Sequence, residues 1–256
     1  MTTRVIWGYR MKKCAAFFDI DGTIYREGLI TELFKKLITH ELVSENTWVD
    51  AVKPAFMKWD KRQGYYDEYL DRMVEMYIES IIGVRQDHIT HIAKRVIEQK
   101  GERVYRFTRS EIERHNKIGN MVIAISGSPV ELVSEMARKY NFDDYRGTTY
   151  VLDSDNRYTG EIIPMWDRES KRKAILDIAK QYDLDLRHCY AYGDTTGDLV
   201  MLSLVGHPYA INPTKTLIEA IKKDSDLSKK VTIIVERKDM IYQIPLALVE
   251  VDLLKE

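Results

Sequence analysis

The feature that most limits how this chain can fold is a series of short apolar runs, each followed by a polar turn. The runs CAAFFDI (14–20), MVIAISGSP (121–129) and HCYAYGD (188–194) end in Asp-Gly, Ser-Gly-Ser-Pro and Gly-Asp turns. HPYAINP (207–213) ends in Asn-Pro, and VTIIV (231–235) fits a further strand. Continuous apolar runs of this length are typical of buried parallel strands. We therefore expect their polar turns to meet at the carboxyl edge of one sheet, where ligands bind in such folds.

Helical periodicity separates these runs. Apolar residues recur at 3.6-residue spacing in 130–140 and again in 174–182. Strands that alternate with helices predict an open α/β sheet. The segment GTTYVLDSDNRYTGEI (147–162) has two β-prone arms around a polar turn, which predicts a hairpin.

The alternation stops between about residues 28 and 118. This stretch contains no convincing strand and at least three amphipathic helices, within 30–38, 66–81 and 89–97. The sequence therefore predicts an α/β fold with a Rossmann-like parallel-sheet core and an inserted all-helical cap domain. The expected division is a core of 11–27 plus 119–256, a cap of 28–118 and a possible extension at 1–10.

Composition narrows the classes of partner. The 256 residues are 45% hydrophobic and carry a formal net charge of -1, which gives no reason to expect nucleic acid or an anionic membrane as a partner. No apolar stretch is long enough for a transmembrane helix, and no signal peptide is evident. Cys14 and Cys189 do not make a disulfide framework; we expect buried thiols and a reducing, cytoplasmic setting. The oligomeric state stays open.

The turn DIDGT brings two carboxylates together. Asp19 and Asp21 would point to opposite faces of a straight strand, so the chain must turn, and Gly22 permits the turn. Two carboxylates in one loop can bind a hard cation, and one of them can attack phosphorus. An ordinary acidic turn is the alternative interpretation.

The turn GDTTGD repeats this chemistry at another strand end. Asp194 and Asp198 are one helical turn apart, close enough to share an ion, although acidic residues also suit a helix N-terminus. Ser126 and Gly127 offer a hydroxyl and free backbone N–H groups to a phosphate oxygen. Lys171 could neutralise a phosphoryl oxygen, and its neighbours Arg172 and Lys173 compete with it for this role.

The order DxD, Ser, Lys, GDxxxD resembles the four motifs of phosphatases in the haloacid dehalogenase superfamily. The resemblance covers about 14–27 and 121–215, and it is closest to the phosphoserine-phosphatase-like branch with a helical cap. It implies a phosphatase that uses Mg²⁺ and forms an aspartyl-phosphate.

The resemblance also implies a role for each motif residue. Asp19 would be the nucleophile and a metal ligand, and Asp21 the general acid/base with its carbonyl on the metal. Asp194 and Asp198 would complete the metal site. The phosphoryl group would lie against the remaining residues of the motifs, which are Thr23, Ser126, Gly127 and Lys171. Thr23 would also support the loop.

The resemblance leaves the substrate open. The expected partner is a small phosphorylated metabolite, and Tyr25, Arg26, Glu27 and Arg72 are the candidates for its recognition. Glu27 and Arg72 lie one residue away from the acidic and basic positions that the phosphoserine enzymes use. The open alternatives are a phosphoserine phosphatase proper, a phosphotransferase on the same fold, and an inactive regulatory or binding protein.

Overall fold

The computed structural model describes residues 14–61, 63–64 and 66–250. The possible extension at 1–10 lies outside these residues. None of the described helices has the length and apolar content needed to cross a membrane.

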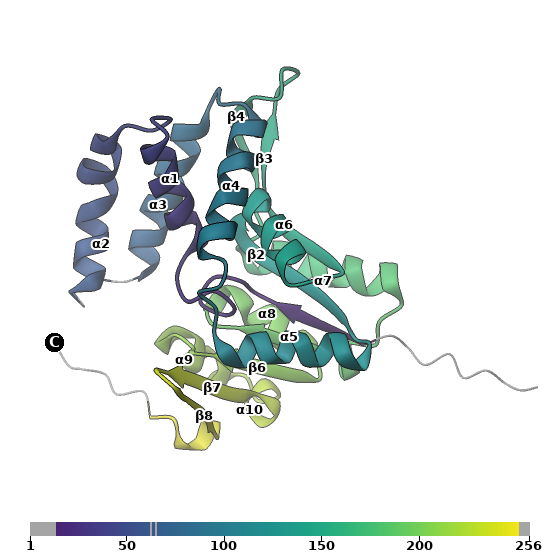
Figure 1. Ribbon diagram of the computed structural model, residues 1–256. Helices are drawn as coiled ribbons and strands as arrows, with labels where there is room; N and C mark the ends of the chain where they lie inside the picture. Colours follow the sequence, from purple (N-terminus) through teal and green to yellow (C-terminus); the bar gives the residue numbers. More distant parts are fainter. Residues whose placement is uncertain (1–13, 62, 65, 251–256) are drawn as a thin grey trace, which may run out of the picture.

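Within the described residues, eight strands form one sheet in the order β4-β3-β2-β1-β5-β6-β7-β8 (Figure 1). All neighbouring pairs from β3 to β7 are parallel, while β4 and β8 run antiparallel at the two edges. The strands are β1 (Ala15–Phe18), β2 (Met121–Pro129), β3 (Asp144–Leu152), β4 (Tyr158–Ile163), β5 (Tyr190–Gly193), β6 (His207–Ile211), β7 (Thr232–Arg237) and β8 (Met240–Ile244). The predicted parallel sheet and the predicted hairpin, which is β3–β4, are both confirmed.

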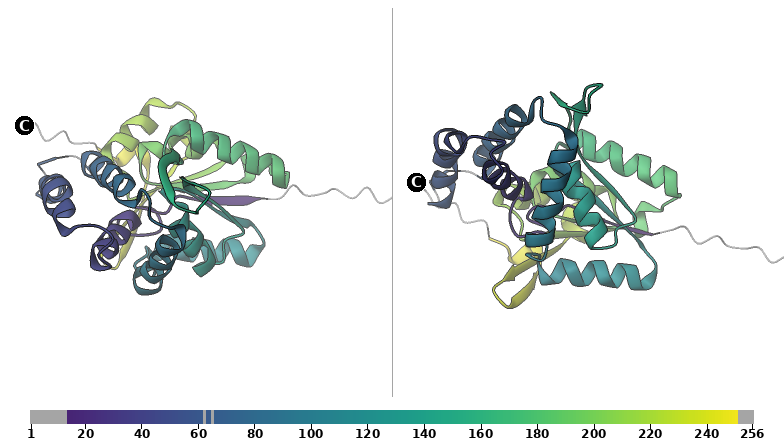
Figure 2. Two further views of the ribbon diagram at one scale, coloured as in Figure 1. Left: turned by 90° about the horizontal axis from the view of Figure 1, so that it is seen from above. Right: turned by 45° about the horizontal axis from the view of Figure 1, so that its top comes forward.

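Helices cover both faces of the sheet, as Figure 2 shows. Phe17 points to a cluster shared with α7 (Arg168–Tyr182), α8 (Leu199–Leu204), α9 (Lys215–Lys223) and α10 (Leu227–Lys230). Phe18 points to the opposite cluster, with α5 (Arg106–Ile118) and α6 (Val130–Lys139). Since successive side chains of a strand face opposite ways, a strand buried on both faces must be apolar throughout.

Within its described residues, the stretch between β1 and β2 contains helices joined by loops and no strand of the sheet, as predicted. It comprises α1 (Leu29–Thr39), a π-helical turn (Thr47–Val52), α2 (Lys53–Asp60), α3 (Tyr66–Ile81), α4 (Gln86–Lys100) and α5. The helix α5 lies against the sheet, where the Tyr192 hydroxyl donates to Glu111 at 2.7 Å. The helices α1, α3 and α4 share one apolar cluster with β1, β2 and α6.

The two chain segments that join the sheet to these helices run side by side. Tyr25 pairs with Val104, and the N–H of Tyr105 donates to the carbonyl of Ile24 at 2.9 Å. Glu236 of β7 fastens the same junction, because it accepts from Arg26 and from the first N–H groups of α5. The helical insertion therefore begins and ends at one place, directly beside the turn that follows β1.

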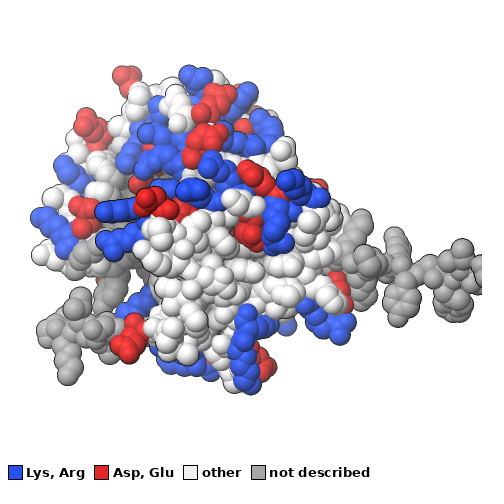
Figure 3. Space-filling view, turned by 60° about the horizontal axis from the view of Figure 1, so that its bottom comes forward, with Lys and Arg blue, Asp and Glu red and all other residues white. Residues whose placement is uncertain are grey.

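The surface shows no strip of one charge on the face drawn in Figure 3. Lysine and arginine mix with acidic residues there, and a broad area carries no charged side chain. Cys14 and Cys189 are free thiols. Cys189 is buried as expected, but the expectation was wrong for Cys14, which lies directly before β1 and is partly exposed.

Candidate active site

Asp19 lies directly after β1 at the carboxyl edge of the sheet and is only 6% exposed. The ammonium of Lys171, in the first turn of α7, lies 2.8 Å from Asp19 Oδ1 and 2.6 Å from Asp198 Oδ1. Asp167 positions this turn, because its carboxylate accepts from the N–H of Ser170 and caps the helix. Arg172 and Lys173 are exposed, so the structure brings Lys171 to Asp19 and leaves its two competitors in solvent.

Three carboxylates converge at this edge. Asp19, Asp194 and Asp198 each offer an oxygen, and these oxygens lie within 4.8 Å of one another. Burial, opposed by Lys171 and reinforced by the negative charge of Asp198, raises the pKa of Asp19 well above its usual range. Burial and the same carboxylates raise the pKa of Asp194. A cluster of oxygen ligands whose charges repel one another fits a hard divalent cation such as Mg²⁺.

Gly22 lets Asp194 approach the turn after β1. Its φ of +78° belongs to the left-handed region, and a Cβ at this position would lie 2.0 Å from Asp194 Oδ2. Thr23 is fully buried and its hydroxyl donates to Asp194 Oδ1 at 3.2 Å. Thr23 therefore braces a carboxylate of the cluster.

Asp198 holds the other side of the cluster. One of its oxygens accepts from the N–H groups of Asp194 and Thr195 at 3.0 and 3.1 Å, and the other contacts Lys171. Asp198 thus fixes both the loop that carries Asp194 and the lysine.

Asp21 occupies a separate hydrogen-bonded setting. Its Oδ1 accepts from the N–H of Leu29 at 2.7 Å, and its Oδ2 accepts from the hydroxyls of Ser128 at 2.5 Å and Ser126 at 3.4 Å. Burial raises the pKa of the Asp21 carboxyl despite these donors. A buried carboxyl with a raised pKa, close to a second carboxylate and a lysine, has the properties needed for proton transfer.

The last residues of β2 are closely packed. Ser126 is fully buried, and a Cβ on Gly127 would lie 2.9 Å from the Cβ of Trp166. Sequence reasoning missed Ser128 as a partner of Asp21. Its place two residues after Ser126 in SGSP, on the same side of an extended chain, was the available signal.

The four candidates for substrate recognition make contacts elsewhere. Arg72 is exposed and donates to Glu75 and to the carbonyl of Ala51. Glu27 pairs with Arg103 at 2.8 Å. Arg26 pairs with Glu236 at 3.1 Å, and Tyr25 is fully buried in the junction.

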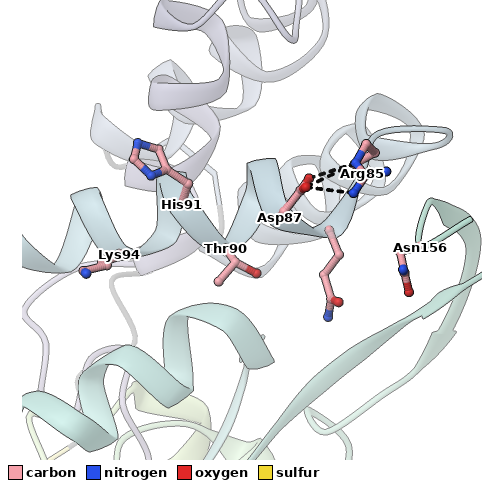
Figure 4. Close-up of a pocket in the computed structure, with 7 residues that line it drawn as sticks. Arg85, Asp87, Thr90, His91, Lys94 and Asn156 are labelled. Atoms are coloured by element: carbon pink, nitrogen blue, oxygen red, sulfur yellow. Dashed lines mark hydrogen bonds and ion pairs between the residues drawn. The ribbon is translucent and has the colours of Figure 1, made fainter.

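A pocket of about 500 Å³ lies apart from these carboxylates, between the start of α4 and the turn of the β3–β4 hairpin (Figure 4). Arg85 at its rim pairs with Asp87 at 2.9 Å. None of the predicted site residues lines this pocket.

Comparison with known proteins identifies the family of this chain. The family model of haloacid dehalogenase-like hydrolases matches residues 16–203. The inhibition of morphological differentiation protein of Streptomyces azureus is 26% identical over 82% of this chain and 75% of its own length. A Mycobacterium tuberculosis protein named as a probable phosphatase is 27% identical over 80% of this chain and 71% of its own.

Solved structures agree in fold. A Bordetella pertussis protein of unknown function matches with a TM-score of 0.66 and 16% identity, over 83% of this chain and 96% of that protein. A phospho-aspartyl intermediate analogue of phosphoserine phosphatase matches with a TM-score of 0.55 and 18% identity, over 89% of this chain and 95% of that one. The chain therefore belongs to the haloacid dehalogenase-like hydrolases.

Proposed function

We propose that this protein is a Mg²⁺-dependent phosphatase that hydrolyses a small phosphate monoester through an aspartyl-phosphate on Asp19. The observation that carries the proposal is the buried contact of Lys171 with both Asp19 and Asp198, inside a cluster of three carboxylates. A structural acidic turn would not need a lysine that is 3% exposed. The names of relatives, among them a probable phosphatase, support the same reaction class.

In the first step, a carboxylate oxygen of Asp19 bonds to phosphorus while the bond from phosphorus to the substrate oxygen breaks. Asp21 donates its proton to the departing oxygen, which leaves as an alcohol. Lys171 stabilises the negative charge that gathers on the transferring group. Proton transfer of this kind is typically worth about 10²–10⁴-fold in rate.

In the second step, Asp21 takes a proton from water, whose oxygen bonds to phosphorus as the bond to Asp19 breaks. Inorganic phosphate leaves and both aspartates return to their starting state. Ser126 and Ser128 hold Asp21 in place throughout. Mg²⁺, bound by Asp19, Asp194 and Asp198, would supply positive charge that lets the anionic phosphate approach a carboxylate.

We propose that the helices α1 to α4 act as a cap that controls access to this site by moving about the junction of 24–28 with 103–105. The hydrogen bond from Leu29 to Asp21 links the first turn of α1 to the acid/base residue. Closure would exclude water until the substrate is in place.

The test measures phosphate release from a broad panel of phosphate monoesters, with Mg²⁺ and with EDTA. We expect turnover with Mg²⁺ only, and none with Asp19→Asn. Full activity of Asp19→Asn would disprove the proposed nucleophile. A new phosphorylated product on addition of alcohols would instead identify a phosphotransferase.

A further inference from the structure

The two cysteines of the chain lie together at the amino edge of the sheet, the edge opposite to the carboxylates. Cys14 directly precedes β1 and Cys189 directly precedes β5. These strands are parallel neighbours, so their starts are side by side. Asp19 and Asp194 each come five residues after one of the cysteines, which is about 17 Å along an extended chain. The thiols are therefore remote from the proposed phosphatase chemistry.

Each sulfur contacts the peptide group that adjoins the other cysteine. Cys14 Sγ lies 2.9 Å from the carbonyl oxygen of His188, the residue before Cys189. The N–H of Ala15, the residue after Cys14, donates to Cys189 Sγ at 3.3 Å. The Cys189 thiol also lies 3.3 Å from the carbonyl oxygen of Asp185. Both sulfurs are thus directed into the space between the same two backbone segments.

The two thiols also interact with each other. A hydrogen bond with Cys189, together with burial, raises the pKa of Cys14. The same hydrogen bond, aided by the N–H of Ala15, outweighs burial and lowers the pKa of Cys189. Since the thiolate is the reactive form of cysteine, Cys189 supplies the nucleophilic sulfur of this pair.

Access to the pair is restricted to one side. Cys189 is fully buried, whereas Cys14 is partly exposed. A small oxidant can therefore approach past Cys14, while Cys189 is shielded from bulky reagents. A thiolate with a lowered pKa beside a second cysteine is the arrangement that oxidants convert to a disulfide. An isolated buried cysteine has neither property and is inert.

We propose that Cys14 and Cys189 form a dithiol site that a peroxide oxidises to a disulfide, and that this bond fastens β1 to β5. The Cys189 sulfur bonds to one oxygen of hydrogen peroxide as the O–O bond breaks, and the other oxygen takes a proton and leaves as water. The Cys14 sulfur then bonds to the Cys189 sulfur and displaces the remaining oxygen, which leaves as a second water with the Cys14 proton. The two sulfurs lose two electrons and the peroxide gains them. Exchange with an added thiol restores the pair.

The disulfide closes a loop that runs from residue 14 to residue 189. This loop contains the helical insertion and most strands of the sheet. A cross-link restricts the unfolded chain, and the restriction grows with the length of the closed loop. The oxidised chain should therefore unfold at a higher urea concentration than the reduced chain. This inference does not depend on the phosphatase activity proposed above.

The experiment treats the full chain with hydrogen peroxide, blocks the remaining thiols and maps the tryptic peptides with and without dithiothreitol. We expect the peptide of Cys14 to be joined to the peptide of Cys189, both free thiols to be lost and the urea midpoint to rise. Dithiothreitol should reverse all three changes. A cross-link between two chains, or oxidation of Cys14 beyond the sulfenic acid while Cys189 stays free, would overturn the inference.

Cys14→Ala is the matched control. It alters a partly exposed residue outside the strands, so the fold should be retained. Peroxide should form no cross-link in this variant and should leave its urea midpoint unchanged. Cys189→Ala removes the other sulfur and should behave in the same way. A rise of the midpoint in either variant, or an unchanged midpoint in the oxidised unmodified chain, would contradict the proposed link between β1 and β5.

Discussion

At the scale of the residue, Lys171 sets the charge balance of the site. It is buried between two carboxylates. Burial alone lowers the pKa of a lysine, but Asp19 and Asp198 outweigh it and raise the pKa of Lys171. The ammonium is therefore charged at any pH at which the fold exists.

Lys171→Met should reduce phosphate release by about 10²-fold or more, since one source of charge stabilisation is lost. Without divalent cation it should also lower the free energy of unfolding by about 3–5 kcal/mol, because two buried carboxylates lose their partner. Urea unfolding in EDTA and in Mg²⁺ measures the free energy of unfolding, and the decrease caused by Lys171→Met should be smaller in Mg²⁺. Lys173→Met, which alters an exposed side chain of the same helix, is the control and should change neither quantity.

Gly22 offers a second test. Gly22 and Gly83 have similar φ values, +78° and +76°, so the backbone strain of Ala alone should cost about 1 kcal/mol of stability at either position. Only the Gly22 Cβ meets Asp194; nothing lies within 4 Å of the Gly83 Cβ. We expect Gly22→Ala to abolish activity and weaken Mg²⁺ binding, whereas Gly83→Ala keeps both. Equal activity of the two variants would contradict the contact between Gly22 and Asp194.

Part of the site can be predicted from sequence because its residues follow directly after apolar runs. Asp19 and Asp194 directly follow β1 and β5, Ser126 lies in the last part of β2, and the parallel order brings these strand ends together. The hydrogen bond from the N–H of Leu29 to Asp21 could not be predicted in this way. It depends on how the first helix of the insertion packs against the turn after β1, which no local pattern encodes.

At the scale of the element, α5 is fastened to the sheet by a buried histidine. His115 is fully buried, its Nε2 lies 2.9 Å from the Tyr192 hydroxyl, and Tyr192 stacks on Phe18 at 4.2 Å between ring centroids. Burial and the charge of Arg114 lower the pKa of His115 to about 4.

This shift predicts a pH dependence of stability. Between the ordinary histidine pKa of 6.5 and about 4, the unfolded chain binds a proton that the folded chain does not. Stability is therefore fully present above pH 6.5 and falls as the pH drops toward 4, by about 3 kcal/mol from this group. Urea unfolding of the unmodified chain and of His115→Gln, from pH 7.5 to pH 4.5, measures the difference. If the free energy of unfolding depended on pH with the same slope in both proteins, this result would argue against a neutral buried His115.

The elements that the sequence did not indicate are those with little buried surface. None of the described residues of α2 is buried, so it has no clear apolar stripe. The strand β8 is exposed along most of its length. Hydrophobic periodicity records burial, and an element that buries little leaves a weak pattern.

At the scale of the whole molecule, one apolar cluster joins the helical insertion to the sheet. It includes Phe18 and Val122 of the sheet, Leu33 of α1, Tyr77 of α3 and Ile97 of α4. We therefore expect the insertion and the sheet to unfold in one cooperative transition. The fold class and the helical nature of the insertion followed from sequence, but this shared cluster did not.

Tryptophan fluorescence can test this cooperativity. Trp59 lies on α2 and Trp166 near the site, so variants in which one of these is the only one of the four tryptophans retained report on different parts. Their urea transitions should coincide with each other and with the loss of circular dichroism. Two separated midpoints would show that the insertion unfolds on its own.

The central place of β1 in the sheet has a consequence for how the protein is made on the ribosome. The strand that precedes Asp19 is synthesised before its two neighbours in the sheet, β2 and β5, which begin at Met121 and Tyr190. Lys171 and the carboxylates of Asp194 and Asp198 also come later in the chain. Asp19 therefore cannot meet these partners until the residues up to Asp198 have been synthesised, so under the proposed mechanism a shorter nascent chain cannot attack phosphate esters.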